Sequence, residues 1–100
     1  MKNVTLRQLK IFEAVARNLS FSRAAEELHL TQPAVSMQVQ SLEELAGLPF
    51  TEQAGKKVRL TAAGEEIARQ ARRIAEQLRE AGEAMAALKG VESGRLKIGV

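Results

Sequence analysis

The feature that most constrains the fold is a long heptad pattern in the second half of the chain. Residues 62–89 contain no proline, and apolar side chains recur there at alternating spacings of four and three. This spacing predicts one long helix with a single apolar seam, as in coiled coils. The residues of the seam are Ile67, Ala71, Ile74, Leu78, Ala81, Met85 and Leu88.

Something must cover this seam. The chain has 100 residues, so a small domain is all that remains beside the helix. Two arrangements are open: the helix pairs with a second copy of itself, or it folds back on its own domain as an ordinary amphipathic helix. We favour pairing, and therefore expect residues 62–89 to be a dimerisation helix in a homodimer.

The first part of the chain predicts a compact helical domain over residues 4–61. A first helix is expected over residues 6–18, with Thr5 as its cap. Its apolar stripe, at spacings of three and four, consists of Leu6, Leu9, Phe12, Ala16 and Leu19. A short helix, a turn and another helix follow over residues 21–40, which is the pattern of a helix-turn-helix. Either Ser20 or Ser22 can cap the short helix, and the sequence does not decide between them.

The second helix of this motif has an unusual polar face. Thr31 can cap it, and Pro33 falls in its first turn. Gln32, Ser36 and Gln40 recur every four residues, so one face is polar but uncharged, with Pro33 and Met37 beside it. Amide, hydroxyl and apolar groups suit base edges in a DNA major groove. The alternative is a plain solvated helix face.

Two short strands are expected after this helix, over residues 50–53 and 58–60, with Gly55 in the turn between them. Basic side chains gather at the turn, namely Lys56, Lys57 and Arg59. These cations would repel one another with no anion nearby, and DNA phosphates would supply one. The alternative is a solvated basic loop.

Further cations occupy the first and second helices. Arg23 lies in the first turn of the short helix, where its charge opposes the helix dipole, so a nearby phosphate or simple solvation is needed to account for it. Arg7, Lys10 and Arg17 lie off the apolar stripe of the first helix, and some of them could also meet phosphate.

Composition removes several other classes of protein. The chain has no cysteine, a single histidine and a net charge of +3. His29 has no paired nucleophile, and neither a glycine-rich phosphate loop nor a metal-ligand spacing is present, so we expect no enzyme, metal or cofactor. The sequence has no secretory apolar region and no apolar run long enough to span a membrane, which makes a cytoplasmic protein the expectation.

The last residues predict a change of structure. Residues 90–94 are expected to form a hinge, and residues 95–100 alternate between apolar and polar in the manner of a strand. A single strand at the end of the chain would lack a partner. We therefore expect a longer protein, of which this chain is one part.

Residues 21–28, 30–36 and 58–64 together resemble the N-terminal domain of LysR-type bacterial transcriptional regulators. Residues 5–9 and 26–38 are similar to the subgroup that activates Calvin-cycle (carbon-fixation) operons. The resemblance implies a mainly α fold: a winged helix-turn-helix of three helices and a two-stranded wing, followed by a long coiled-coil linker helix. Residues 90–100 would then be a hinge and the first strand of an effector domain.

The resemblance also implies partners and contacts. The full protein would be a dimer or tetramer that binds operator DNA and answers a small-molecule effector bound in the missing domain. In the family, residues matching Gln32, Pro33 and Ser36 approach bases, and those matching Thr31 and the wing approach the backbone. The full set of candidate DNA contacts is Ser22, Arg23, Thr31, Gln32, Pro33, Ser36, Met37, Gln40, Gln53, Lys56, Lys57 and Arg59.

The chain departs from the family pattern at three places. Phe50-Thr51 stands where members usually carry Leu-Phe, which leaves the packing of the wing open. Gln53 and Met37 stand where many members carry arginine, which predicts fewer charged contacts. We predict a sequence-specific, dimeric DNA-binding regulator. The alternative is a winged-helix module that binds proteins, and the salt dependence of binding would separate the two.

Overall fold

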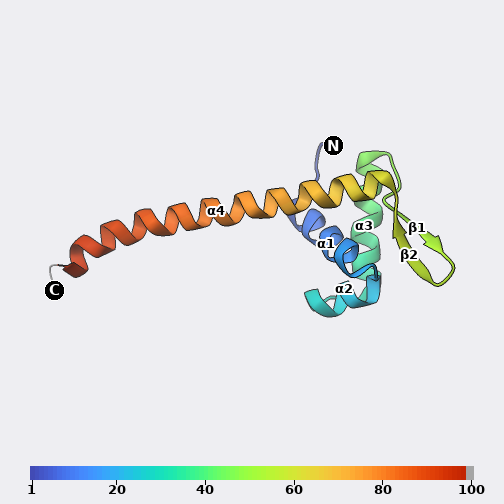
Figure 1. Cartoon of the computed structure of the whole chain (residues 1–100), viewed down its shortest axis with the longest axis horizontal. Coiled ribbons are helices and arrows are strands. Elements are labelled where there is room, and N and C mark those ends of the chain that lie inside the picture. The colour runs from blue at the N-terminus through green and yellow to red at the C-terminus, as the bar shows by residue number, and fades with distance from the viewer. Residues whose placement is uncertain (99–100) are drawn as a thin grey trace.

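The computed structural model describes the backbone of residues 1–98 and the side chains of residues 1–90. Within these residues it contains four helices and one two-stranded sheet, and is mainly helical, as expected (Figure 1). The elements are α1 (Leu6–Asn18), α2 (Phe21–Leu28), α3 (Gln32–Ala46), β1 (Thr51–Ala54), β2 (Lys57–Leu60) and α4 (Ala62–Ile98).

Local capping explains where the three short helices begin. The Thr5 side chain accepts a hydrogen bond from the Gln8 N–H at 3.1 Å, and the Gln8 side chain accepts one from the Thr5 N–H, which makes a capping box. Ser20, not Ser22, caps α2, and Thr31 caps α3. Gly47 ends α3 in the left-handed conformation at φ 76°.

Helix α1 is the centre of the core, since it packs against α2, α3 and α4. Its apolar stripe was only partly predicted. Ile11 and Val15 are buried although the predicted stripe omits them, whereas Leu6 and Leu19 lie half exposed at its two ends. The reason is that α2, α3 and α4 cover α1 from several sides. Side chains in the middle of α1 are therefore buried on more than one face, whereas those at its ends are poorly covered.

The wing is an antiparallel hairpin in which Thr51 pairs with Leu60 and Ala54 pairs with Lys57. Gly55 and Lys56 form the two-residue turn, with Gly55 at φ 67°, a conformation that favours glycine. The first strand starts at Thr51 because Phe50 turns inward and is only 2% exposed.

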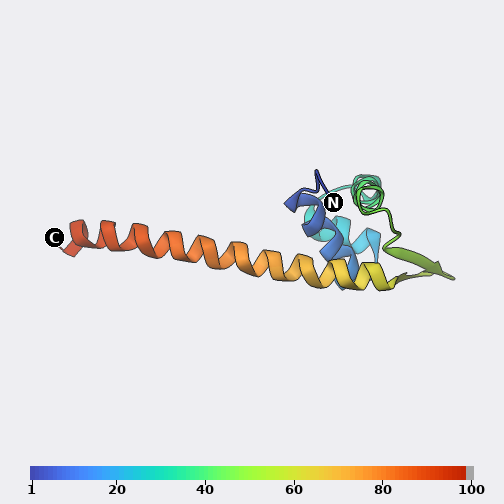
Figure 2. The ribbon, with the colours of Figure 1, turned by 90° about the horizontal axis from the view of Figure 1, so that it is seen from above.

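Helix α4 has two parts with different surroundings. Its first turns pack on the domain, with Ala68 and Ala71 buried and Ile67 partly buried. From residue 72 to residue 90 every side chain is exposed, and the helix projects away from the other elements (Figures 1 and 2). The wing projects from the opposite end, so the molecule extends over 64 × 27 × 19 Å.

The hinge and strand expected near the end of the chain are wrong for the residues that the structure describes. Helix α4 continues through Gly90 and Gly94 to Ile98, and residues 99–100 lie outside the described part. A helix satisfies its backbone hydrogen bonds within itself, whereas a strand needs a neighbour, and the wing strands already pair with each other. Within the described residues, no helix is both long enough and apolar enough to cross a membrane.

Candidate nucleic-acid interface

Helix α3 is held in the domain by one face and exposes the other. Val35, Val39 and Leu42 are buried at 2% exposure or less, which fixes the rotation of the helix about its axis. The buried Gln8 side chain adds a polar tether, since its Nε2 donates to Ser41 Oγ at 3.3 Å. Consequently the opposite face of α3 points to solvent on a rigid support.

That exposed face carries the residues expected to read bases. Gln32, Pro33, Met37 and Gln40 are exposed, and Ser36 is half-buried among them. Met37 is 69% exposed, the most of any large apolar side chain in the part of the chain that is described. No acidic or basic side chain lies among them, so the face offers hydrogen-bonding groups and apolar surface without charge.

Gln32 and Ser36 are already bonded to each other. The Gln32 side-chain N–H donates to the Ser36 hydroxyl oxygen at 2.8 Å, across one turn of the helix. The Gln32 carbonyl oxygen and the Ser36 hydroxyl hydrogen are left to face a ligand. With the second N–H of the Gln32 amide, the pair therefore presents one acceptor and two donors side by side, and base edges in the major groove can match such a pattern.

The start of α2 supplies the next candidate contacts. Ser20 is the cap, because its hydroxyl accepts from the Arg23 N–H at 3.1 Å. Ser22 and Arg23 both lie exposed in the first turn, where a ligand can reach their side chains. Thr31, which precedes α3, is also exposed, and its hydroxyl accepts from the Ala34 N–H at 3.2 Å.

The wing divides its predicted contacts between two faces. Arg59 pairs with Glu52 across the strands and Lys57 pairs with Ala54, so these side chains share the face turned away from the core. Gln53 pairs with Val58 on the other face, apart from Lys57 and Arg59. Lys56 lies in the turn itself. All the predicted wing contacts are exposed. Of these residues, Lys57 and Arg59 share one face of the hairpin, whereas Gln53 lies on the other face.

Glu52 changes one argument made from the sequence. Repulsion among the basic wing residues does not by itself require an outside anion. The strand register places Glu52 directly opposite Arg59, so a negative charge already lies among them. The case for phosphate binding therefore depends on the exposure of Lys56 and Lys57 at the tip, not on repulsion.

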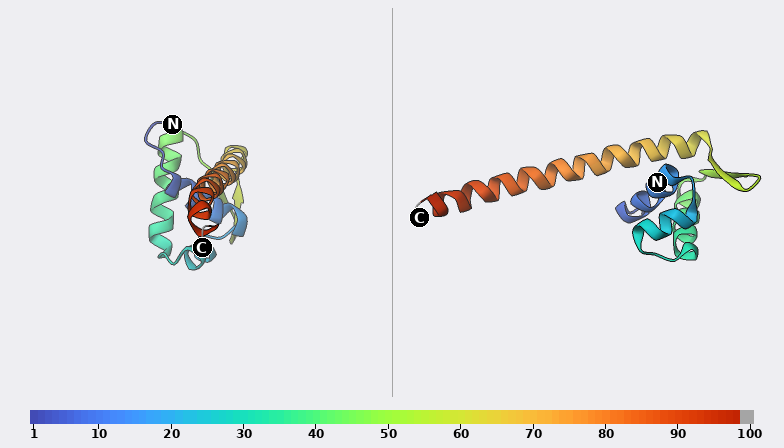
Figure 3. Two further views of the ribbon diagram at one scale, coloured as in Figure 1. Left: turned by 90° about the vertical axis from the view of Figure 1, so that its left-hand side faces the viewer. Right: turned by 60° about the horizontal axis from the view of Figure 1, so that its bottom comes forward.

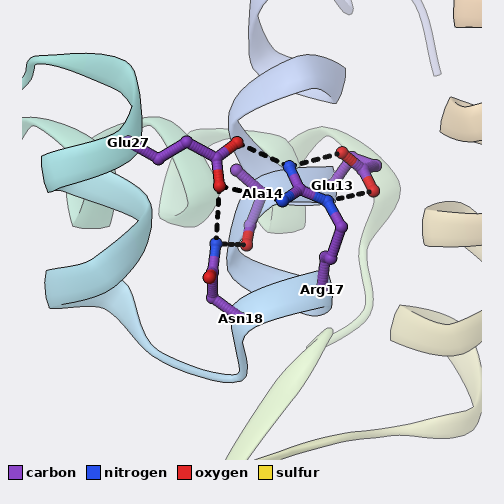
Figure 4. Close-up of polar contacts among 5 residues, drawn as sticks. All are labelled: Glu13, Ala14, Arg17, Asn18 and Glu27. Atoms are coloured by element: carbon purple, nitrogen blue, oxygen red, sulfur yellow. Dashed lines mark hydrogen bonds and ion pairs between the residues drawn. The ribbon is translucent and has the colours of Figure 1, made fainter.

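Arg17 is not free to meet phosphate, because it holds α1 to α2. Its guanidinium bonds Glu27 of α2 at 2.6 Å and Glu13 of α1 at 3.2 Å, and Asn18 donates to the same Glu27 carboxylate at 3.0 Å (Figure 4). Bonding from Arg17, and then from Asn18, lowers the pKa of Glu27 to about 2. The same two carboxylates raise the pKa of Arg17.

The predicted dimer seam is only partly available to a partner. Ala71 is buried in the core of its own domain and Ile67 packs against that core, so these two are intradomain residues and their assignment to the seam is corrected. The fold-back alternative thus holds for the first turns of α4. The remaining seam residues are exposed, namely Ile74, Leu78, Ala81, Met85 and Leu88.

A groove beside this stripe was missed by the sequence argument. It has a volume of about 350 Å³ and is lined by α1 and α4, chiefly by Leu6, Leu9, Ile74 and Leu78. Leu6 is a predicted core residue, but it lines this groove and is 49% exposed. Its position as the first residue of α1 was the available signal, since a helix end is poorly covered by neighbours. No group of three or more metal-ligating side chains lies within the described residues.

Helix α3 and the wing lie at one end of the molecule, while the free part of α4 leaves from the other (Figure 3). An uncharged polar helix face and a basic hairpin therefore lie on the same domain, with an apolar stripe leading away from it. This arrangement can bind a polyanion at one end and a second protein chain along α4.

Comparison with known proteins identifies relatives of this arrangement. Residues 6–65 match the family described as bacterial regulatory helix-turn-helix protein, lysR family. The chain is 56% identical over 98 residues to the RuBisCO operon transcriptional regulator of Allochromatium vinosum, which covers 98% of this chain and 32% of that protein. It is 55% identical over 95 residues to the HTH-type transcriptional regulator CbbR of Rhodospirillum rubrum, with 95% and 32% covered. The chain spans about a third of the length of these relatives.

Solved structures give the same picture of the fold. The chain is similar to the protein in the crystal structure of a CbnR_DBD-DNA complex, with a TM-score of 0.78 at 38% identity, over 84% of this chain and 97% of that one. It is also similar to BenM_DBD in a complex with catB site 1 DNA, with a TM-score of 0.80 at 30% identity, over 84% and 93% of the two chains.

The winged helix-turn-helix fold and the likeness to carbon-fixation regulators, both expected from the sequence, are thus confirmed, and the relatives are regulators, not enzymes. With residues 6–65 matched and all the elements of that fold present, the chain belongs to the LysR family of DNA-binding transcription regulators.

Proposed function

We propose that this chain is the DNA-binding part of a dimeric regulator that recognises a specific operator and acts in the cytoplasm. The observation that carries the proposal is the exposed, uncharged face of α3 on a rigidly packed helix. A helix of this kind fits the major groove, where amides and hydroxyls distinguish base pairs. The names of the relatives extend the proposal to an operon for carbon fixation.

Each contact residue has a role in this proposal. Gln32 and Ser36, with Gln40 one turn further on, read base edges, and Pro33 and Met37 touch apolar groups such as the thymine methyl. Backbone phosphates are met by a second set of residues from the helix starts and the wing. This set consists of Ser22, Arg23, Thr31, Gln53, Lys56, Lys57 and Arg59.

We also propose that α4 joins two copies of the chain. Its exposed stripe from Ile74 to Leu88 and the groove at Leu6 form one apolar surface of the kind that marks an interface. A symmetric pair would set two copies of α3 about one duplex turn apart, roughly 34–36 Å. The boundary between the DNA-binding unit and the free linker would lie near residue 72, since the residues before it belong to the core.

The rest of the protein follows from the length of the relatives. This chain covers 32% of the first of them, so an effector domain that binds a small molecule, and tetramer formation, are assigned to the remainder. No cofactor, metal or enzymatic activity is proposed for this part of the protein.

Selection of bound duplexes from a random pool tests the proposal directly. We expect an enriched motif with two related half-sites, because a two-fold symmetric dimer reads a palindrome. Binding should also weaken steeply as salt is added, since phosphate contacts release counterions. Failure to enrich any sequence, together with binding to a protein partner that salt does not affect, would favour the protein-binding alternative instead.

A further inference from the structure

Glu43 binds the exit from α3 through both its backbone and its side chain. Its backbone carbonyl accepts hydrogen bonds from the Gly47 N–H at 2.8 Å and the Leu48 N–H at 3.3 Å. Its side-chain carboxylate reaches further and accepts from the Phe50 N–H at 2.7 Å. Three backbone donors of the connection to the wing thus converge on one residue in the last turn of α3, the proposed recognition helix.

Phe50, the last residue before the wing, is fixed on its other sides as well. Its ring packs on Phe12 at a centroid distance of 5.2 Å, and its carbonyl accepts from the Thr61 N–H at 3.0 Å. The Thr61 hydroxyl donates to the Pro49 carbonyl at 2.7 Å, and the backbone of Gly64 lies directly against the Phe50 carbonyl. The residue that enters the wing and the residue that leaves it are therefore bonded to each other.

Helix stability does not explain a carboxylate at this position. Glu43 lies in the last turn of α3, where a negative charge opposes the helix dipole. The carboxylate instead satisfies the N–H of a buried residue, because Phe50 is 2% exposed and water does not replace the bond. Glu43 therefore acts on the connection to the wing.

We propose that Glu43 is a positioning residue that fixes the wing relative to the recognition helix, so that both engage one duplex together. This inference rests on the proposed function, since it assigns to Glu43 the geometry on which wing contacts depend. Glu43 itself touches no DNA in this proposal. Its effect passes through the Phe50 N–H to the start of β1, and through Phe50 and Thr61 to the end of β2.

The test compares the salt dependence of binding to one fixed mixed-sequence duplex. In the unaltered chain, Lys57→Ala should reduce the slope of log affinity against log salt by about one unit, since one phosphate contact is lost. In a chain that also carries Glu43→Ala, the wing loses its bond to α3 at the Phe50 N–H, and Lys57→Ala should leave the slope nearly unchanged. A merely structural role for Glu43 would not abolish the effect of a distant lysine.

Two control variants separate charge from geometry. Glu43→Gln keeps an oxygen that can accept from the Phe50 N–H, so the full effect of Lys57→Ala should be retained in it. Glu44→Ala removes the same charge from the neighbouring exposed residue, and should also retain the effect. If Lys57→Ala lowers the slope equally with and without Glu43→Ala, the role of Glu43 is overturned while the wing contact stands. If Lys57→Ala has no effect even in the unaltered chain, the wing contact and this inference both fail.

A measurement on the unaltered chain covers the case in which Glu43→Ala does not fold. The Phe50 amide should exchange with solvent as slowly as core amides of α1, because the Glu43 bond must open first. Exchange at the rate of exposed loop amides would overturn the proposal without any variant.

Discussion

Gly64 lies so close to Phe50 that its missing side chain is a structural requirement. A Cβ built on Gly64 would lie 2.0 Å from the Phe50 carbonyl oxygen and 2.9 Å from its carbonyl carbon, and both atoms belong to backbone. We expect Gly64→Ala to destabilise the fold by about 1–3 kcal/mol, because the connection to the wing must shift. Urea unfolding followed by circular dichroism measures this loss.

Gly90→Ala is the matched control for this prediction. Gly90 also lies within α4, but a Cβ there meets nothing within 4 Å. Alanine favours a helix interior over glycine by about 0.5–1 kcal/mol, so this variant should lose no stability. Equal losses in both variants would show that close contact with Phe50 is not the cause.

Gln32 is the residue on which base reading depends most in the proposed interface. Gln32→Ala should cost about 1–3 kcal/mol in binding to the selected operator and little on mixed-sequence DNA, because the amide contacts bases and not phosphates. The fold should not change, since the side chain is exposed and, among the described residues, is bonded only to Ser36. Titration of both duplexes by fluorescence anisotropy measures the difference, and equal losses on the two would remove Gln32 from the readers.

Individual residues show which features of the candidate site could be predicted from the sequence and which could not. The exposed polar face of α3 was predictable, because Gln32, Ser36 and Gln40 repeat at helical spacing and all lie on one accessible side. The bond between Gln32 and Ser36 was not, since it depends on side-chain rotamers. The doubt raised by Phe50-Thr51 is also answered: the Phe50 ring fills the core against Phe12, and Thr51 starts the strand.

The contact between α1 and α2 gives a prediction about pH. Glu27 has a folded-state pKa of about 2, lowered from 4.5 by bonding from Arg17, so its ionised form is stabilised in the fold. This contribution is complete above pH 4.5 and is lost as pH falls towards 2. Glu27→Gln should therefore lower the free energy of unfolding at neutral pH. In urea titrations, the difference in that free energy between the variant and the unaltered chain should disappear as pH falls through this acid range.

Glu26→Gln provides the control at the level of the element. Glu26 is the preceding residue of α2 and forms no ion pair in the described part of the chain. Its replacement should leave the acid dependence as it was. If the difference in free energy of unfolding between Glu27→Gln and the unaltered chain stays constant with pH, the Arg17 bond does not stabilise the fold.

Sequence signals that act within a few residues predicted the helices and strands well, whereas features that depend on distant parts of the chain were predicted poorly. Caps and apolar spacing located α1, α2 and α3, because those signals act within a few residues. The strand expected at residues 95–100 was wrong as far as Ile98, because a strand depends on partners that local alternation does not reveal. Ile67 and Ala71 were misassigned for a related reason. The heptad spacing shows that they share the apolar face of α4, but it does not show which part of the protein covers that face.

The whole molecule is a small domain from which the exposed part of α4 projects, and this shape predicts that two copies of the chain associate. Leu78 is 51% exposed in the middle of the apolar stripe and lines the groove with Leu6. Leu78→Lys should leave the single chain folded, because the ammonium group stays in water. In a dimer it would bury that charge against apolar side chains, which is strongly unfavourable, so sedimentation should show monomers.

The control for this prediction uses the opposite side of the same helix. Ala87 lies nine residues from Leu78, or two and a half turns at 3.6 residues per turn, so its side chain is turned away from the stripe. Ala87→Lys adds the same charge at an exposed position and should leave a dimer intact. Because paired recognition helices read paired half-sites, only Leu78→Lys should also reduce the preference for the palindrome over a single half-site. Dimers that persist in Leu78→Lys would mean that two copies associate through another surface and that the stripe along α4 serves a different partner.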